Sequence, residues 1–311
     1  MKIAIFGVGG VGGYFGWRLT QAGEEVIFIA RGAHLKALRE VGLKMETPDG
    51  ASFVQPVQAV ADPAQLGPVD AVILGVKAWQ VPEAAESIRP LIGPDTFVVP
   101  LQNGVEAPTQ LSQALGKEHV FGGLCYIVAL KLGPGHIRHA GMEPRIAFGE
   151  LDNRITERAR QLEAAFRRAD VNVEIPPDIH TAMWDKFLFI ASFSGVASIT
   201  RAPVGAIRSV PETRRILQDV MQEIFAVARA RNIALKDNAV EVTMGVIDRL
   251  PAEGTASMQR DIMAGQPSEL SSQCGAVVRL GEEVGQPAPL NSFIYASLLP
   301  MELRARGQMD F

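Results

Sequence analysis

The sequence has few cysteines, few aromatic residues and no strong excess of either charge. Only Cys125 and Cys274 are cysteine, and they lie far apart in the chain. Two isolated thiols favour a protein with unpaired buried cysteines over a disulfide-linked secreted domain. The formal net charge is −4 and the basic residues are scattered, so there is no basic patch of the kind that nucleic-acid-binding proteins carry.

Long apolar runs are also missing, which argues against a membrane span. No uninterrupted run reaches the roughly 18 residues that a spanning helix needs. The richest stretch, 187–199, contains Gly195 and three serines, and we predict a buried core helix there. The chain runs from Met1-Lys2 straight into an apolar strand, without a signal-peptide pattern. We therefore expect a cytoplasmic protein that binds neither membrane nor nucleic acid.

What the sequence does have is length and apolar content, since 47% of its 311 residues are hydrophobic. That is enough for two domains with their own cores. In the first half, strand patterns alternate with helix patterns, which predicts a mostly parallel sheet with right-handed crossovers. We expect strands at 2–6, 25–30, 43–45, 51–57, 70–76 and 96–100, and helices at 11–22, 33–40, 81–91 and 105–115.

The pattern changes further along the chain. Strands at 120–131, 135–139 and 145–148 suggest an antiparallel addition to the sheet, followed by a helix at 155–169 and a last strand at 171–175. After Pro176-Pro177-Asp178 only helices are predicted. We place a Rossmann-type α/β domain at 1–176 and an all-helical domain at 177–311. The predicted helices of the second domain cover 179–199, 212–231, 238–250, 257–263, 269–283 and 292–306.

A glycine-rich loop follows the first strand and opens the first helix. It reads Gly7, Val8, Gly9, Gly10, Val11, Gly12 and fits G-x-G-x-x-G in the required context. Gly7 would make the tight turn, Gly9 would let the backbone approach a pyrophosphate, and Gly12 would let helix and strand pack closely. The helix N-terminus offers N–H groups to the phosphates. The loop predicts a dinucleotide site, the alternative being a structural turn.

The end of the second strand bears on the choice of cofactor. NAD sites place a carboxylate there, whereas this sequence has Arg31. A guanidinium can pair with the extra phosphate of NADP, so we favour NADP(H) over the alternative of a solvated arginine. Lys36 and the segment that begins at Lys77 are further candidates for the border of this site. Asn103, in an Asn-Gly pair after a strand, either faces nicotinamide or substrate or is an ordinary turn residue.

Lys186 stands out in the second half, in an apolar segment that reads Trp184-Asp185-Lys186-Phe187. A buried lysine has a lowered pKa and can protonate a carbonyl oxygen. The residues alone favour a snorkelling lysine, with its ammonium in water or paired with Asp185. Glu269 and Ser257 have plain readings as first-turn and capping residues. No cysteine or histidine cluster indicates a metal site.

Together these residues resemble the ketopantoate reductase (2-dehydropantoate 2-reductase) family. The resemblance covers nearly the whole chain. It rests on Gly7–Gly12, Arg31, Lys77-Ala78-Trp79-Gln80, Gln102-Asn103-Gly104, Trp184-x-Lys186, Ser257-Met258-x-x-Asp261 and Ser268-Glu269.

The resemblance implies NADPH-dependent reduction of the 2-keto group of ketopantoate to pantoate, a step toward pantothenate. It implies that Lys186 is the general acid and that Asn103 lies near nicotinamide and substrate. Glu269 would hold the substrate hydroxyl, and Ser257 would lie near its carboxylate. Arg31 would bind the 2′-phosphate. The family also includes dimers, so a homodimer is a possible assembly.

The sequence departs from the family pattern one and two turns after Lys186. Family members carry substrate-contacting asparagines there, whereas this chain has Ile190 and Ser194, followed by Gly195 in place of a proline. We keep Ser194 as a candidate substrate contact, with Arg201 as a residue that would compensate. The alternatives are a reductase of a different 2-oxo acid and, in another class, a catalytically silent NADP(H)-binding sensor.

Overall fold

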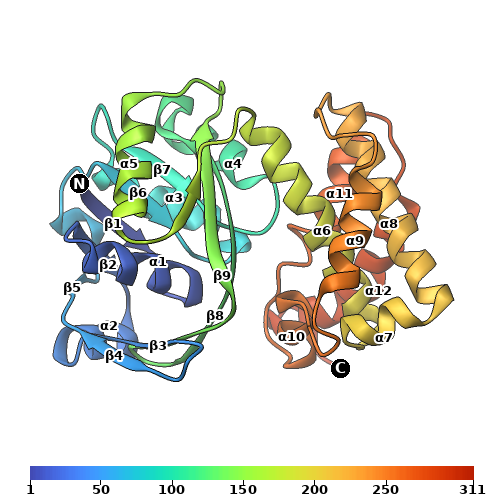
Figure 1. Ribbon diagram of the computed structural model, residues 1–311, viewed down its shortest axis with the longest axis horizontal. Helices are drawn as coiled ribbons and strands as arrows, with labels where there is room; N and C mark the ends of the chain where they lie inside the picture. The colour runs from blue at the N-terminus through green and yellow to red at the C-terminus, as the bar shows by residue number, and fades with distance from the viewer. The chain divides into compact units, whose positions relative to one another are not determined.

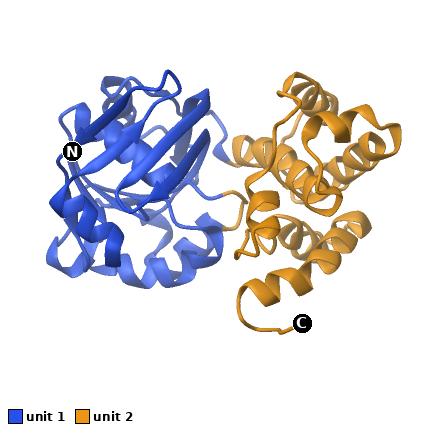
Figure 2. Cartoon of the chain, turned by 90° about the horizontal axis from the view of Figure 1, so that it is seen from below, with its two compact units in different colours: residues 1–102, 107–179 blue, residues 103–106, 180–311 orange.

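The computed structural model describes residues 1–311, which divide into two compact units (Figure 2). Unit 1 comprises Met1–Gln102 and Ala107–Ile179, and unit 2 comprises Asn103–Glu106 and His180–Phe311. The division after Ile179 lies three residues beyond the expected boundary after residue 176. The short segment Asn103–Glu106, expected in the first domain, belongs to unit 2. The predicted order of an α/β half followed by a helical half is confirmed.

Unit 1 contains the predicted parallel sheet, with strand order β5-β2-β1-β6-β7, but β5 was not predicted and the strands expected at 43–45 and 51–57 lie outside this sheet. All four strand pairs in it are parallel. Its central strands are short and apolar and lie between layers of helices (Figure 1), as crossover connections require. The five strands are β1 (Lys2–Phe6), β2 (Glu25–Ile29), β5 (Gln58–Val60), β6 (Ala71–Leu74) and β7 (Phe97–Pro100).

A second sheet in unit 1 corrects the sequence prediction. The later strands do not extend the first sheet, because β9 (His136–Glu150) is one long strand that organises a sheet of its own. It pairs antiparallel with β8 (Phe121–Gly133) and parallel with β3 (Leu43–Glu46) and β10 (Asn172–Glu174). β4 (Ser52–Gln55) pairs with β3 across a turn at Pro48-Asp49-Gly50.

Alternate side chains of β1 enter two separate cores, as the period of a strand dictates. Ile3 and Ile5 pack in a cluster with residues of α1 and β9, whereas Ala4 and Phe6 pack in a cluster with residues of α3 and α4. The first sheet is therefore covered on both faces. The helices of unit 1 are α1 (Gly10–Gln21), α2 (Gly32–Glu40), α3 (Val81–Ile88), α4 (Ala107–Leu115) and α5 (Glu157–Arg168), with 3-10 turns η1 (Pro63–Gln65), η2 (Ala78–Gln80), η3 (Arg89–Leu91) and η4 (Lys117–His119).

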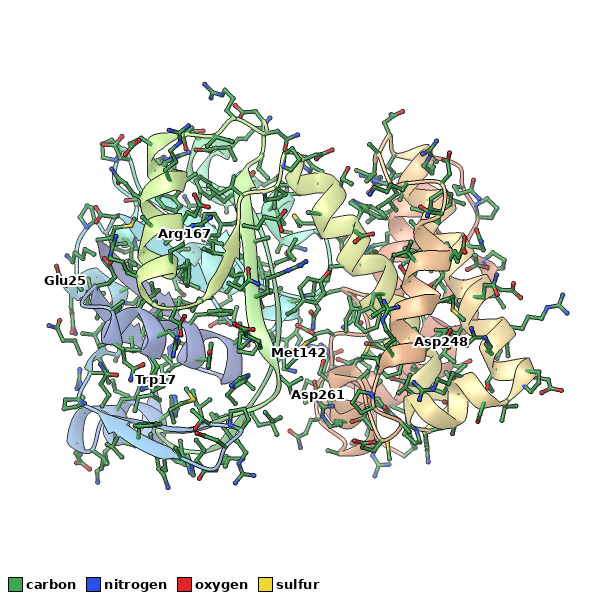
Figure 3. All side chains as sticks on the ribbon, in the orientation of Figure 1. Trp17, Glu25, Met142, Arg167, Asp248 and Asp261 are labelled. Atoms are coloured by element: carbon green, nitrogen blue, oxygen red, sulfur yellow. The ribbon has the colours of Figure 1, made fainter.

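Unit 2 is helical and has a single large apolar core. Its surface is tied by ion pairs such as that between Arg214 of α8 and Asp248 of α9, the latter labelled in Figure 3. The sequence did not predict α7, and the helix expected from residue 269 begins only at Cys274. The helices are α6 (Ile179–Thr200), α7 (Val204–Ser209), α8 (Pro211–Ala230), α9 (Ala239–Arg249), α10 (Ser257–Met263), α11 (Cys274–Glu282) and α12 (Pro289–Ala305).

Helix α6 is the only helix whose length and composition would allow it to cross a membrane. Of its most apolar window, 72% is buried inside the protein. Phe187, Leu188, Ala191 and Val196 all belong to the core of unit 2. The prediction of a buried core helix at 187–199 is thereby confirmed.

Candidate active site

The glycine loop joins β1 to α1 and has the geometry that its sequence predicts. Gly7 has φ +96°, in the left-handed region, and a Cβ there would lie 2.6 Å from the nitrogen of Val76. A Cβ on Gly12 would lie 2.2 Å from the carbonyl oxygen of Gly7, so only glycine lets the helix sit this close to the strand. A Cβ at Gly9 would meet only the carbonyl oxygen of Gly75, at 4.0 Å, whereas one at Gly10 would lie 2.2 Å from the carbonyl oxygen of Ala129, so β8 packs against the first residue of α1.

The first turn of α1 is suited to an anion. The helix starts at Gly10, and its N-cap residue Gly9 has no side chain to accept from the first N–H groups. These N–H groups and the helix dipole attract negative charge. At Gly9 the backbone has room for the approach of a ligand. The loop therefore fits the pyrophosphate of a dinucleotide.

Arg31 lies at the junction between β2 and α2. It is the N-cap residue of α2 and follows the end of β2. Its side chain is 69% exposed, and its Nη1 atom lies 3.6 Å from a carboxylate oxygen of Glu83 on α3. Such an exposed, loosely held guanidinium is available to a phosphate. Lys36 pairs with Glu40 along α2, and the backbone N–H of Lys77 donates to the Gln80 side chain at the start of η2.

His34 is a partly buried residue near this junction that the sequence did not single out. Its Nδ1 atom accepts a hydrogen bond of 2.9 Å from the backbone of Gly135, in the β8–β9 turn. Burial lowers the pKa of His34, and the charge of Lys131 lowers it further. A neutral His34 thus connects α2 to the second sheet.

In unit 2, one amide joins a buried ammonium to a buried carboxylate. The Nζ atom of Lys186 on α6 donates to Oδ1 of Asn103 at 2.9 Å, and Nδ2 of Asn103 donates to Oε2 of Glu269 at 3.1 Å. Lys186 is 8% exposed and Glu269 5%. Because an ammonium only donates and a carboxylate only accepts, these two hydrogen bonds fix the orientation of the Asn103 amide. The structure thus brings together three residues that were predicted from separate segments.

The backbone around Asn103 is held by contacts that a spacing argument could not reveal. Gly104 has φ +115°, and a Cβ on it would lie 2.7 Å from the carbonyl oxygen of Ser272. Two residues further on, Glu106 pairs with Arg279 of α11 at 2.7 Å. Asn103 is therefore set against the turn that carries Glu269.

The turn that carries Glu269 is held by the buried carboxylate of Glu302, which was not predicted from the sequence. Glu302 of α12 accepts from the backbone N–H of Ser268 at 3.1 and 3.0 Å and from its hydroxyl at 2.5 Å. Arg306 pairs with Glu302 and donates to the carbonyl oxygen of Ser268. Glu269 is the next residue, so its position depends on this clamp. Glu302 lies 33 residues away inside an ordinary helical pattern, which gave no signal.

The remaining predicted substrate contacts occupy different settings. Ser194 is completely buried, and its hydroxyl has no hydrogen-bond partner. Ser257 begins α10 and is partly buried, whereas Arg201 is exposed at the end of α6 with φ +54°. Gly195 has a packing reason, because a Cβ there would lie 2.9 Å from the sulfur of Cys274.

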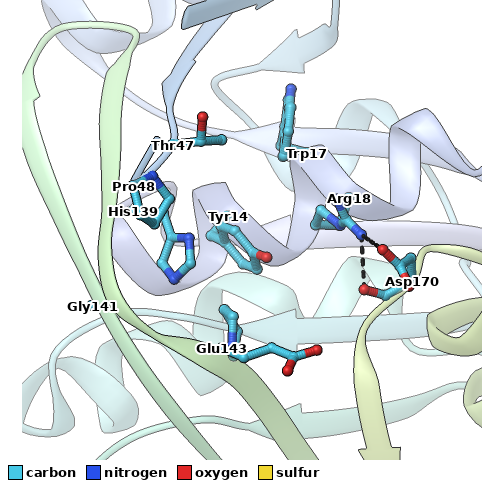
Figure 4. Close-up of a pocket in the computed structure, with 10 residues that line it drawn as sticks. Tyr14, Trp17, Arg18, Thr47, Pro48, His139, Gly141, Glu143 and Asp170 are labelled. Atoms are coloured by element: carbon cyan, nitrogen blue, oxygen red, sulfur yellow. Dashed lines mark hydrogen bonds and ion pairs between the residues drawn. The ribbon is translucent and has the colours of Figure 1, made fainter. Parts of the chain in front are cut away.

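A separate pocket of about 360 Å³ lies in unit 1 (Figure 4). It is formed by residues of α1, the β3–β4 turn and β9 and by Asp170, and none of the predicted site residues lines it. Burial raises the pKa of the Tyr14 phenol in this pocket. Its lining comprises Tyr14, Trp17, Arg18, Thr47, Pro48, His139, Gly141, Glu143, Pro144 and Asp170.

Comparison with known proteins accounts for both halves of this arrangement. Residues 3–153 match the family model described as Ketopantoate reductase PanE/ApbA, and residues 178–302 match the one described as Ketopantoate reductase PanE/ApbA C terminal. The chain belongs to the ketopantoate reductase family. It is accordingly an oxidoreductase of a family that uses a nicotinamide cofactor.

Individual members of the family resemble the chain over almost its whole length. A 2-dehydropantoate 2-reductase of Mesorhizobium japonicum is 31% identical over 93% of this chain and 94% of its own. An uncharacterized oxidoreductase of Bacillus subtilis is 32% identical over 96% and 98%. The crystal structure of a PanE/ApbA family ketopantoate reductase from Ralstonia eutropha JMP134 superimposes with a TM-score of 0.89, at 32% identity over 98% of this chain and 100% of that one.

Proposed function

We propose that this family member reduces a 2-oxo acid with NADPH, and that ketopantoate, reduced to pantoate, is its leading substrate. The proposal rests on the two hydrogen bonds that connect the buried side chains of Lys186 and Glu269 through the amide of Asn103. An ammonium and a carboxylate held by one amide provide a donor for a ketone oxygen and an acceptor for a hydroxyl. The family relationship supports the same chemistry.

Lys186 is the general acid in this proposal. As a 2-keto group is reduced, negative charge develops on its oxygen, and an ammonium hydrogen-bonded to that oxygen stabilises the charge and then transfers its proton. The bond from Nζ to Oδ1 of Asn103 fixes where the ammonium lies on α6. Asn103 therefore orients the acid, and the apolar surroundings of α6 strengthen the interaction.

Glu269 and the serines would position the substrate. The Glu269 carboxylate is an acceptor for a hydroxyl on the substrate, and the Ser268–Glu302 contacts keep it in place. We assign Ser257, and on α6 Ser194, to the substrate as well. These contacts would select the acid, whereas Lys186 would act on any 2-oxo group.

The glycine loop would hold the pyrophosphate of the cofactor, and Arg31 the 2′-phosphate that distinguishes NADP from NAD. The room for a Cβ at Gly9, the lack of a side-chain cap on α1 and the exposed guanidinium of Arg31 support this assignment. When bound, the reduced nicotinamide supplies the hydride for the keto carbon.

The buried α6 and the absence of a basic patch favour a soluble, cytoplasmic enzyme acting on a small acid.

A second candidate keeps the chemistry and changes the acid. Ile190 and Ser194 stand where family members carry asparagines, and an alkyl side chain cannot replace the hydrogen bonds of an amide. Such a site would select a 2-oxo acid with a more apolar face.

The test is NADPH oxidation by the purified protein with a panel of 2-oxo acids, with NADH in parallel. The proposal expects ketopantoate to have the highest kcat/KM and NADPH to be preferred. A higher kcat/KM for another acid would establish the second candidate. No turnover with any acid, despite NADPH binding, would refute both and favour a sensor.

A further inference from the structure

Gln273 is a fully buried amide with no hydrogen-bond partner. Its exposure is 0%, and neither its oxygen nor its nitrogen is paired. It is the only side chain in the structure with two such buried unpaired atoms. Leaving a buried amide unpaired is unfavourable, since the group has lost its hydrogen bonds to water. Buried unpaired groups of this kind call for an explanation, and binding is one of them.

The position of Gln273 connects it with the residues assigned to catalysis. Its backbone N–H donates to the carbonyl oxygen of Glu269 at 3.0 Å, which closes one helical turn between the two residues. Gln273 has φ −109° and ψ −94° and is the N-cap residue of α11, so the turn from Glu269 ends where α11 begins. The preceding residue, Ser272, has its carbonyl oxygen against Gly104, next to Asn103. Gln273 therefore belongs to the turn that carries Glu269.

The same turn runs alongside α6 where the family asparagines are missing. The sulfur of Cys274 contacts the carbonyl oxygen of Ala191 at 3.9 Å and lies 2.9 Å from the place of a Cβ on Gly195. Between these positions α6 carries Ser194, which is also fully buried with an unpaired hydroxyl. Two buried polar groups without partners thus come from neighbouring elements, Gln273 four residues after Glu269 and Ser194 eight residues after Lys186 on α6.

We propose that the Gln273 amide, with the Ser194 hydroxyl, binds a hydroxyl group of the substrate and thereby replaces the amides that α6 lacks. The inference rests on the proposed function. A hydroxyl suits these partners because it accepts from an amide N–H while it donates to an amide or carboxylate oxygen. A second carboxylate on the substrate would need a cation, which neither side chain supplies. The substrate class is a 2-oxo acid that carries a hydroxyl group.

The experiment compares ketopantoate with 3,3-dimethyl-2-oxobutanoate, which differs from it only by lacking the hydroxyl. We expect the wild-type protein to prefer ketopantoate. In Gln273→Met, the ratio of the two kcat/KM values should fall about tenfold, since a site built to bind a hydroxyl discriminates through that bond. The matched control is Gln259→Met. Gln259 is another buried amide of unit 2, but both its ends are bonded, to Ala256 and Ala202. Its loss should leave the ratio unchanged.

Thermal unfolding of the ligand-free variants gives a second readout. Gln273→Met removes an unpaired buried amide and should raise Tm, whereas Gln259→Met breaks two bonds and should lower it. A lower Tm for Gln273→Met would show that the amide is bonded within the protein and would overturn the inference. If the wild type reduces ketopantoate and the ratio of the two kcat/KM values is the same in Gln273→Met, the inference is also overturned. If the wild type reduces neither acid, the proposed function fails and this inference falls with it.

Discussion

The Nζ atom of Lys186 donates a 2.9 Å hydrogen bond to Oδ1 of Asn103, a residue 83 positions earlier in the chain. The same amide donates to Glu269, 166 positions later than Asn103. A small segment, Asn103–Glu106, belongs to the helical unit although the residues on either side of it belong to the α/β unit. Lys186, the proposed general acid, is therefore hydrogen-bonded to a residue that lies between two segments of the α/β unit in the sequence.

Removing that amide should damage turnover more than binding. Asn103→Ala leaves Lys186 and Glu269 without their bridge, so the ammonium loses its fixed position. We expect kcat to fall on the order of 100-fold, with a smaller change in KM, in steady-state assays with the best acid. Asn172→Ala, at an exposed position on β10, is the control. Wild-type kcat in Asn103→Ala would show that the bridge has no role in orienting the acid.

Arg31 should decide between the two nicotinamide cofactors. Its guanidinium is exposed and only 3.6 Å from one carboxylate oxygen. We expect Arg31→Ala to raise the Kd for NADPH about tenfold or more and to leave the Kd for NADH nearly unchanged, as measured by calorimetry. Glu83→Gln, which removes the competing carboxylate, should bind NADPH at least as tightly as the wild type. Equal losses for both cofactors in Arg31→Ala would contradict a phosphate contact.

The contacts of Glu302 on α12 with the turn that carries Glu269 should contribute to the free energy of unfolding. Glu302 is buried and bonded to Ser268 and Arg306. Glu302→Gln removes the charge that Arg306 needs, and we expect the free energy of unfolding to fall by about 3 kcal/mol, measured by urea denaturation. KM should rise as well, because Glu269 loses its support. Unfolding at the wild-type urea concentration would mean that the clamp contributes little.

The two buried cysteines should not react with alkylating reagents in the native protein. Burial raises the pKa of the Cys274 thiol to about 12, so the reactive thiolate is absent at neutral pH. Cys125 is also buried. We expect iodoacetamide at pH 8 to label neither cysteine until denaturant is added, as judged by mass spectrometry of digests. Rapid labelling of native protein at Cys274 would show that α6 and α11 separate readily.

Stability should depend on pH through His34. Its folded-state pKa lies below its ordinary value of 6.5 because the side chain is buried. The unfolded chain therefore takes up the proton first, and the stabilisation, complete above pH 6.5, is lost as pH falls through the folded pKa. His34→Gln should flatten the decline in the free energy of unfolding between about pH 7 and 5. An equally steep decline in the variant would assign the pH dependence to other groups.

Local features of this protein were predictable, whereas long-range ones were not. The glycine loop, β1 and α1 follow from a motif and two periodicities within 21 residues. The second sheet did not, because β9 pairs with β3, some 90 residues earlier in the chain. Similarly, Lys186 stood out by its apolar neighbours, whereas Glu269 had an ordinary role as a first-turn residue, and their connection through Asn103 is a long-range contact that no local pattern indicates. Glu302 and Gln273 carry no local signal, since their importance comes only from burial and partners.

The most direct test of the account is the effect of Lys186→Ala on turnover and on cofactor binding, measured in the same protein preparation. We predict that kcat for the best 2-oxo acid falls by roughly 100-fold or more while the Kd for NADPH stays close to that of the wild type and of the control Lys236→Ala, an exposed position. Wild-type turnover without the lysine, or a loss of NADPH binding as large as the loss of turnover, would contradict the assignment of Lys186 as the general acid.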